Sequence, residues 1–110
     1  MDKKLYRKRY AKFAELLRHE RLCHGRRITQ EKLAKEMGYT QEQISRIDAG
    51  HRRLYVIELM EYCRAADIDF VGLVSRLPDY LQAYSLWPRA TKDIVKDRKE
   101  AIDEILRNVK

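Results

Sequence analysis

Apolar residues recur at helical spacing through almost the whole chain, and signals for strands are almost absent. In the first segment, Tyr6, Tyr10, Phe13 and Leu17 follow one another at intervals of four, three and four residues. An α-helix turns by about 100° per residue, so this spacing places all four side chains on one face. The sequence therefore predicts an all-α fold, with a first helix that ends near Gly25 and a left-handed cap at that glycine.

A second and a third helix are indicated by residues that begin and end helices. Thr29 is placed to cap the second helix, which ends at Gly38. Thr40 and Gln43 have the spacing of a capping box, so a third helix is expected to begin there and to stop at the next glycine. Ala34 is small enough for the helix crossing, and Gly38 tolerates the positive φ that a tight turn requires.

Three further helices are expected in the rest of the chain. A fourth is marked by the apolar residues Val56, Leu59, Met60 and Cys63. Asp69 is placed to cap a short fifth helix that ends before Pro78, and residues 78–89 then form an aromatic connector. From Thr91 a sixth helix is expected, with the spacing of a very short coiled coil at Val95, Ile102, Ile105 and Val109.

The positive charge is concentrated at the start of the chain. The net charge is +7, and residues 1–28 hold ten Lys and Arg against three Asp and Glu. Such clustering favours a polyanionic partner, either nucleic acid or an anionic membrane surface. The aromatic stripe at Tyr6 and Tyr10 indicates a face directed to the core, so we expect no membrane binding. Residues 1–10 are too charged for a signal peptide, which predicts a cytoplasmic protein, and a DNA partner would associate it with the nucleoid.

The segment from Thr29 to Gly50 contains a specific combined pattern, TQxxLA-xxx-G-xxxxx-IS-xxD-x-G, which the apolar stretch LYVIELMEYCRAADID soon follows. Over residues 13–77 the chain resembles the XRE-like helix-turn-helix regulators, the family of Cro and the phage cI-type (lambda-type) repressors. The resemblance implies a compact five-helix bundle that binds operator DNA, usually as a homodimer. We therefore expect a DNA-binding domain over residues 1–77. Its basic extension over 1–12 and the C-terminal extension over 78–110 lie outside the resemblance.

The resemblance also implies a DNA-binding site. The third helix, residues 40–49, is expected to enter the major groove, with base-reading positions at Gln41, Glu42, Ser45 and Arg46. Amide, hydroxyl and guanidinium groups suit the hydrogen-bond patterns on base edges. Glu42 is expected to be paired, either with cytosine N4 or with Arg46, because an unpaired carboxylate would repel phosphates. Phosphate contacts are expected from Gln30, Thr40, Arg26, Arg27, Arg52 and Arg53, with His51 as a further candidate.

Two positions depart from the pattern of that family. Arg21 and Asp48 stand where the family often has a buried arginine–glutamate pair, and the aspartate is one methylene shorter. Tyr55 stands where the family has an aspartate or serine cap, so the fourth helix is expected to begin without a good cap.

The remaining interpretations concern assembly and chemistry. Dimer contacts are expected from Val71, Val74, Leu77, Trp87, Val95, Ile102, Ile105 and Val109. The alternative is an antitoxin-type protein whose C-terminal tail binds another protein while the domain regulates its own promoter. Two cysteines and nearby histidines could form a metal or redox site, but Cys63 lies at a core-facing position. We expect no metal and no cofactor, and without a nucleophile–base arrangement we expect no enzyme.

Overall fold

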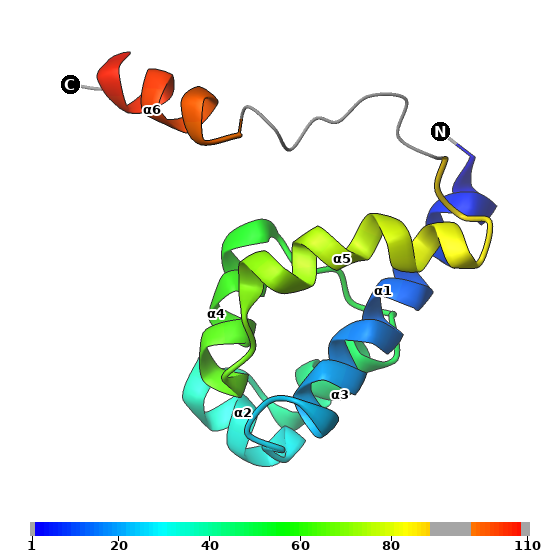
Figure 1. The fold of residues 1–110 in the computed structure, drawn as a ribbon. Coiled ribbons are helices and arrows are strands. Elements are labelled where there is room, and N and C mark those ends of the chain that lie inside the picture. The colour runs from blue at the N-terminus through cyan, green and yellow to red at the C-terminus, as the bar shows by residue number, and fades with distance from the viewer. Residues whose placement is uncertain (1, 89–97, 109–110) are drawn as a thin grey trace.

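The computed structural model describes residues 2–88 and 98–108, and these residues form helices and loops without a strand (Figure 1). The all-α prediction is confirmed. The helices are α1 (Lys3–Cys23), α2 (Gln30–Met37), α3 (Gln41–Asp48), α4 (Val56–Ala66), α5 (Phe70–Ala83) and α6 (Arg98–Asn108). Among the described residues, no helix is long and apolar enough to cross a membrane.

A single hydrophobic core lies between the first five helices. Its most deeply buried large side chains are Leu17, Leu33, Ile44, Ile47, Tyr62, Cys63 and Leu73. Full burial of one leucine or isoleucine stabilises the fold by about 1.5–3 kcal/mol, so these residues hold the helices together. On α1 the predicted face exists, but only its later part reaches the core. Tyr6 and Tyr10 are half-buried and stack on each other, with ring centroids 6.1 Å apart.

The α2–α3 turn has the local structure that its sequence predicts. The Thr29 side chain accepts a hydrogen bond from the Lys32 N–H, which caps α2. Gly38 has a φ of 71°, a left-handed conformation that favours glycine. Thr40 and Gln43 form both hydrogen bonds of a capping box at the start of α3. The orientation of α3 is therefore set by local hydrogen bonds as well as by the core.

The predicted left-handed cap at Gly25 is wrong. The C-cap of α1 is His24, with a φ of −124°, and the left-handed residue in this loop is Arg27, with a φ of 55°. Gly25 lies against the carbonyl oxygen of Ala66, where an added Cβ would clash. The glycine is required here by the close approach of the loop to the end of α4, which only the tertiary fold creates.

The predicted apolar face of α4 is partly wrong. Val56 and Met60 are exposed, and the core is filled by Tyr62 and by small residues near the helix end. Helical spacing fits both faces, and the packing of α4 on α2 and α5 selects between them. As expected, the Tyr55 side chain does not cap α4, although Glu58 accepts a hydrogen bond from the Tyr55 N–H at 3.1 Å.

The prediction that the fifth helix ends before Pro78 is also wrong, because α5 continues through the proline to Ala83. Proline removes one helical hydrogen bond and costs about 3 kcal/mol in a helix interior. Here the proline ring is exposed, and the following turns place Tyr80 against the core and bury Leu81. Burial of these side chains offsets the cost. The first half of the expected connector 78–89 is therefore helix.

The continuation of α5 supports the beginning of α1, which lies beside it in Figure 1. The Arg9 Nε donates a hydrogen bond of 2.6 Å to the Leu86 carbonyl, and its guanidinium lies 4.6 Å from the centroid of the Trp87 ring. The Lys12 ammonium lies 3.8 Å from the centroid of the Tyr84 ring. These contacts hold the basic first turns of α1 against the bundle.

Candidate nucleic-acid interface

The helix α3 separates an apolar face from a polar one. Ile44 and Ile47 are buried, with 0% and 2% of their surface exposed. The four side chains expected to read bases lie exposed on the rest of the helix: Gln41, Glu42, Ser45 and Arg46. The anchored face fixes the backbone of α3, so the exposed groups are presented from a rigid element.

The expected pairing of Glu42 with Arg46 is not found: within the part of the chain that the structure describes, neither side chain makes an ion pair. Such a pair on an exposed helix contributes a net of only about 0.3–0.5 kcal/mol, so the fold loses little without it. The Arg46 backbone has a defined role instead. Its carbonyl accepts hydrogen bonds from the N–H groups of His51 and Arg52, at 2.8 and 3.1 Å.

Behind α3 lies a buried ionic network. The Arg21 guanidinium and the Asp48 carboxylate are 2.8 Å apart, and both side chains are 4% exposed. The Tyr62 hydroxyl donates to Asp48 at 2.9 Å and accepts from Arg21 at 3.0 Å. Burial and the Asp48 charge raise the pKa of Tyr62. The pair expected from the sequence is therefore formed, and Tyr62 is a member that sequence reasoning missed.

This network reaches the start of α2 through Gln30. The Gln30 side-chain amide donates a hydrogen bond of 2.9 Å to the Asp48 carboxylate. Gln30 occupies the first turn of α2, where free backbone N–H groups and the helix dipole favour an anion. Thr40, the N-cap of α3, is exposed. The first turns of α2 and α3 are thus available to phosphates.

Arg52, in the loop between α3 and α4, is partly occupied by contacts within the chain. Its guanidinium lies 4.8 Å from the Tyr39 ring centroid and 3.4 Å from the Glu58 carboxylate. The Tyr39 hydroxyl donates to the same carboxylate. Hydrogen bonds from Tyr39 and from the Tyr55 N–H, with the charge of Arg52, lower the pKa of Glu58. Burial and the Glu58 contact raise the pKa of Tyr39.

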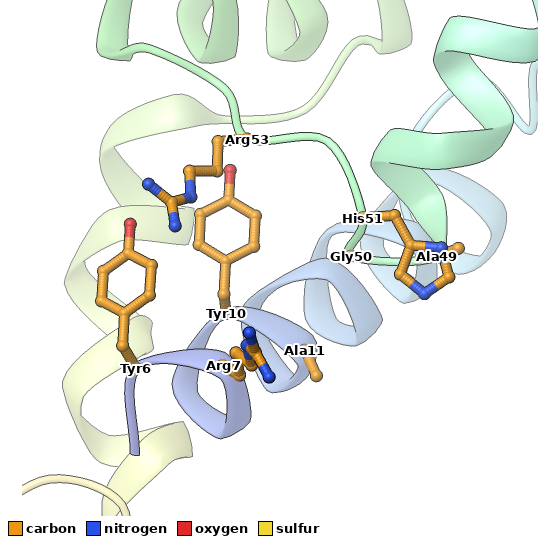
Figure 2. Close-up of a pocket in the computed structure, with 8 residues that line it drawn as sticks. All are labelled: Tyr6, Arg7, Tyr10, Ala11, Ala49, Gly50, His51 and Arg53. Carbon is orange, nitrogen blue, oxygen red and sulfur yellow. The ribbon is translucent and has the colours of Figure 1, made fainter. Parts of the chain in front are cut away.

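Arg53, the next residue of this loop, extends over α1. Its guanidinium lies 4.8 Å from the centroid of the Tyr6 ring. Together with His51, Arg53 lines a hollow of about 440 Å³ between the loop and the first turns of α1 (Figure 2). The sequence predicted a phosphate role for Arg53 but did not indicate that α1 would form the opposite wall.

Arg26 lies apart from these groups. Arg26 Nη1 donates to Glu36 at 2.8 and 3.0 Å and to the Ala65 carbonyl at 3.1 Å. Glu36 is near the C-terminal end of α2, so Arg26 is directed away from the α2 N-terminus. Arg27 is exposed in the loop that leads to α2. The structure therefore does not bring Arg26 together with the other candidate phosphate contacts.

The candidate dimer residues have different environments. Leu77 packs against the core of its own chain, whereas the other described members of this set are exposed: Val71, Val74, Trp87, Ile102 and Ile105. Val95 and Val109 lie outside the described residues.

The cysteines do not form a metal site in the described residues. Cys23 is exposed with its sulfur 3.6 Å from the His19 Nδ1, and no group of three or more metal-binding side chains is found in the described ranges. Cys63 is buried, and burial, with a smaller contribution from Asp69, raises its pKa to about 12. Cys63 is therefore a core residue and not a reactive thiol.

Comparison with known proteins agrees with this geometry. Residues 20–79 match the family described as the Cro/C1-type HTH DNA-binding domain. No curated protein and no solved structure matches the chain. The matched segment includes the whole α2–turn–α3 unit and covers more than half of the 110 residues. The chain belongs to the family of Cro/C1-type helix-turn-helix DNA-binding domains and is a DNA-binding transcriptional regulator.

Proposed function

We propose that this regulator is a homodimeric repressor that reads operator half-sites with residues 40–49 in the major groove. The observation that carries the proposal is the polar face of α3, which is exposed opposite the buried Ile44 and Ile47. A helix held in this way can present side chains to base edges without a change in backbone conformation.

The chemistry of this face suits direct base reading. Gln41 can form two hydrogen bonds with adenine N6 and N7, and Arg46 can form two with guanine O6 and N7. Ser45 can donate or accept, and Glu42 can accept from cytosine N4. Arg46 is exposed and has no ion-pair partner among the described residues, so its guanidinium can bind a base without first breaking an ion pair.

Phosphates on either side of the groove would then meet the elements that flank α3. The N-termini of α2 and α3 supply Gln30, Thr40 and free backbone N–H groups. The loop after α3 supplies Arg52 and Arg53. Such contacts contribute affinity and orientation but not sequence information. Arg27 and Arg26 remain secondary candidates, and Arg26 would first have to release Glu36.

A dimer is favoured by the small size of the reading surface. One helix of eight residues contacts only a few base pairs, and two-fold symmetry doubles the recognised site. Val71 and Val74 are exposed on α5, and Ile102 and Ile105 are exposed on α6. We propose these apolar residues as the dimer contact. The two half-sites would lie about 34–36 Å apart, one turn of the DNA helix.

A second candidate function uses the same tail differently. On α6 the neighbouring Ile102, Ile105 and Leu106 are all exposed, which suits a segment that folds onto another protein. In an antitoxin-type regulator this tail would hold a toxin while the domain represses its own promoter. The two functions predict different structures for the tail in the isolated chain. A dimerising tail is helical without a partner, whereas a toxin-binding tail gains its helical order only when that partner is added.

Selection of bound sequences from a random DNA pool tests the proposed function. We expect an inverted repeat whose half-sites are separated by one helical turn. A parallel selection with Arg46→Ala provides the control, since it should lose preference at one position of each half-site. A single unrepeated site would contradict the dimer. Recovery of no preferred sequence by either protein would contradict sequence-specific binding.

A further inference from the structure

The hollow between α1 and the loop after α3 has walls of an unusual composition. Figure 2 shows Tyr6, Arg7 and Tyr10 of α1 on one side and His51 and Arg53 of the loop on the other. A second hollow of about 480 Å³ shares Tyr6, Arg7 and Arg53 and adds Lys3. Neither hollow has a carboxylate in its lining. Lys3, Arg7 and Arg53 line the second hollow, and Arg7 and Arg53 also line the first. The two hollows share these walls and are together called the basic hollow below.

We propose that this basic hollow is a phosphate-binding site for the DNA backbone, beyond the contacts made by α2, α3 and the loop alone. The inference rests on the proposed function, because it extends the same DNA-binding surface. The hollow begins at Ala49 and Gly50, which directly follow the recognition helix. DNA seated on α3 would therefore pass its sugar–phosphate backbone close to the opening.

The tyrosines add hydrogen-bond donors to the cations. The Tyr10 hydroxyl accepts a hydrogen bond from the Leu54 N–H, and within the described ranges its own proton is free to be donated. Burial raises the pKa of Tyr10, so the phenol keeps that proton at neutral pH. The Arg53 guanidinium lies 4.8 Å from the centroid of the Tyr6 ring, and this contact holds the guanidinium at the opening of the hollow. Arginine, lysine and tyrosine side chains are common donors to phosphate oxygens.

The first turns of α1 are held in place for this role. Asp2 caps the helix by accepting from the Lys4 N–H at 2.9 Å. On the side of the helix that meets α5, Arg9 is fixed by Leu86 and Trp87. Lys3 and Arg7 are one turn apart on the side that lines the hollows, and both are exposed. Their positions are therefore set before DNA binds, which lowers the ordering cost of the contact.

The chain offers a matched control for a test by substitution. Lys4 and Lys8 are also exposed and one turn apart on the same helix, but neither lines either of these two hollows. The variants Lys3→Gln/Arg7→Gln and Lys4→Gln/Lys8→Gln remove the same charge. Binding to the selected operator and to random duplex DNA is measured from low to moderate salt. Thermal unfolding of both variants shows whether the fold is retained, as we expect for exposed residues.

We expect Lys3→Gln/Arg7→Gln to weaken binding on both DNAs by at least tenfold more than the control. Its slope of log affinity against log salt should fall by about one unit, as expected for the loss of one phosphate contact. The charge-preserving variant Lys3→Arg/Arg7→Lys should retain the slope. Equal losses in the two double variants would overturn the proposal in favour of general attraction by net charge. Normal binding by Lys3→Gln/Arg7→Gln, with loss in Arg46→Ala, would overturn the phosphate site and leave the proposed function intact. Absence of DNA binding by the unaltered chain would overturn both.

Discussion

Gln30, in the first turn of α2, donates a hydrogen bond of 2.9 Å to Asp48, the last residue of α3. The same carboxylate is paired with Arg21 of α1 and accepts from Tyr62 of α4. Two helices of the DNA-binding unit are therefore joined to two supporting helices through one buried carboxylate. This network fixes the positions of Gln30 and of the C-terminal end of α3.

Removal of the Asp48 charge should destabilise the protein strongly. Asp48→Asn leaves the Arg21 guanidinium buried without its counter-charge, and loss of one partner of a buried pair costs about 3–5 kcal/mol. Gln30→Ala should cost only about 1 kcal/mol, the usual net contribution of one hydrogen bond. Urea unfolding followed by circular dichroism measures both. The buried-pair interpretation requires that Arg21→Met/Asp48→Leu be more stable than Asp48→Asn.

The α3 side chains should affect specificity rather than general affinity. Gln41→Ala and Arg46→Ala should each lose about 1–3 kcal/mol of binding free energy on the selected operator and relax preference at one base position. Gln41→Ala should change binding to random duplex DNA little, because this substitution removes no charge. Competition titrations on both DNAs measure the difference. Equal losses on the two DNAs would show that these side chains do not read bases.

Two arginines with the same sequence-based prediction should differ in their salt response. Arg53→Ala should lower the slope of log affinity against log salt by about one unit, because Arg53 is exposed in the loop that follows α3. Arg26→Ala should change this slope less, because Arg26 is tied to Glu36 and the Ala65 carbonyl. The measurement is binding to one duplex at several salt concentrations. A larger change for Arg26→Ala would place the DNA on the other end of α2.

Acid should weaken the contact of Glu58 with Tyr39 and Arg52. The folded-state pKa of Glu58 lies below its ordinary value of 4.5, so the carboxylate contributes stability above that pH. This contribution is lost as the pH falls from 4.5 through the lowered pKa. Glu58→Gln should therefore be less stable than the unaltered chain at pH 7, by about 1 kcal/mol at this partly solvated site. The difference in unfolding free energy between the two proteins should shrink below pH 4. A difference that does not change with pH would show that it does not come from the ionised Glu58 carboxylate.

The dimer contact should depend on the tail. A chain that ends after Pro88 keeps the buried Leu81 and the contacts of Trp87 with Arg9, so its bundle should remain folded. Sedimentation of this chain and of the full chain without DNA compares their masses. At micromolar concentration we expect a dimer for the full chain and a monomer for the shortened chain. Monomers in both cases would contradict the proposed assembly, and dimers in both would assign the contact to α5.

The sequence by itself determined the all-α class and the α2–turn–α3 unit. Thr29, Gly38, Thr40 and Gln43 act through hydrogen bonds and backbone angles within a few residues, so their roles were predictable. The exposed face of α3 was predictable for the same reason, since helical periodicity with Ile44 buried fixes which residues face outward.

Only the tertiary structure decided the features that depend on distant segments. Helical spacing allowed two faces for α4, and the Tyr62 hydroxyl is satisfied inside the core only because Arg21 and Asp48 meet it there. Local sequence rules predicted that α5 ends before Pro78, but the helix continues to Ala83 because Leu81 is buried. The last turns of α5 then hold the basic start of α1. The placement of Arg7 opposite Arg53 across one hollow follows from that packing. Propensity acts over one or two turns, whereas burial free energy is shared by segments far apart in the chain.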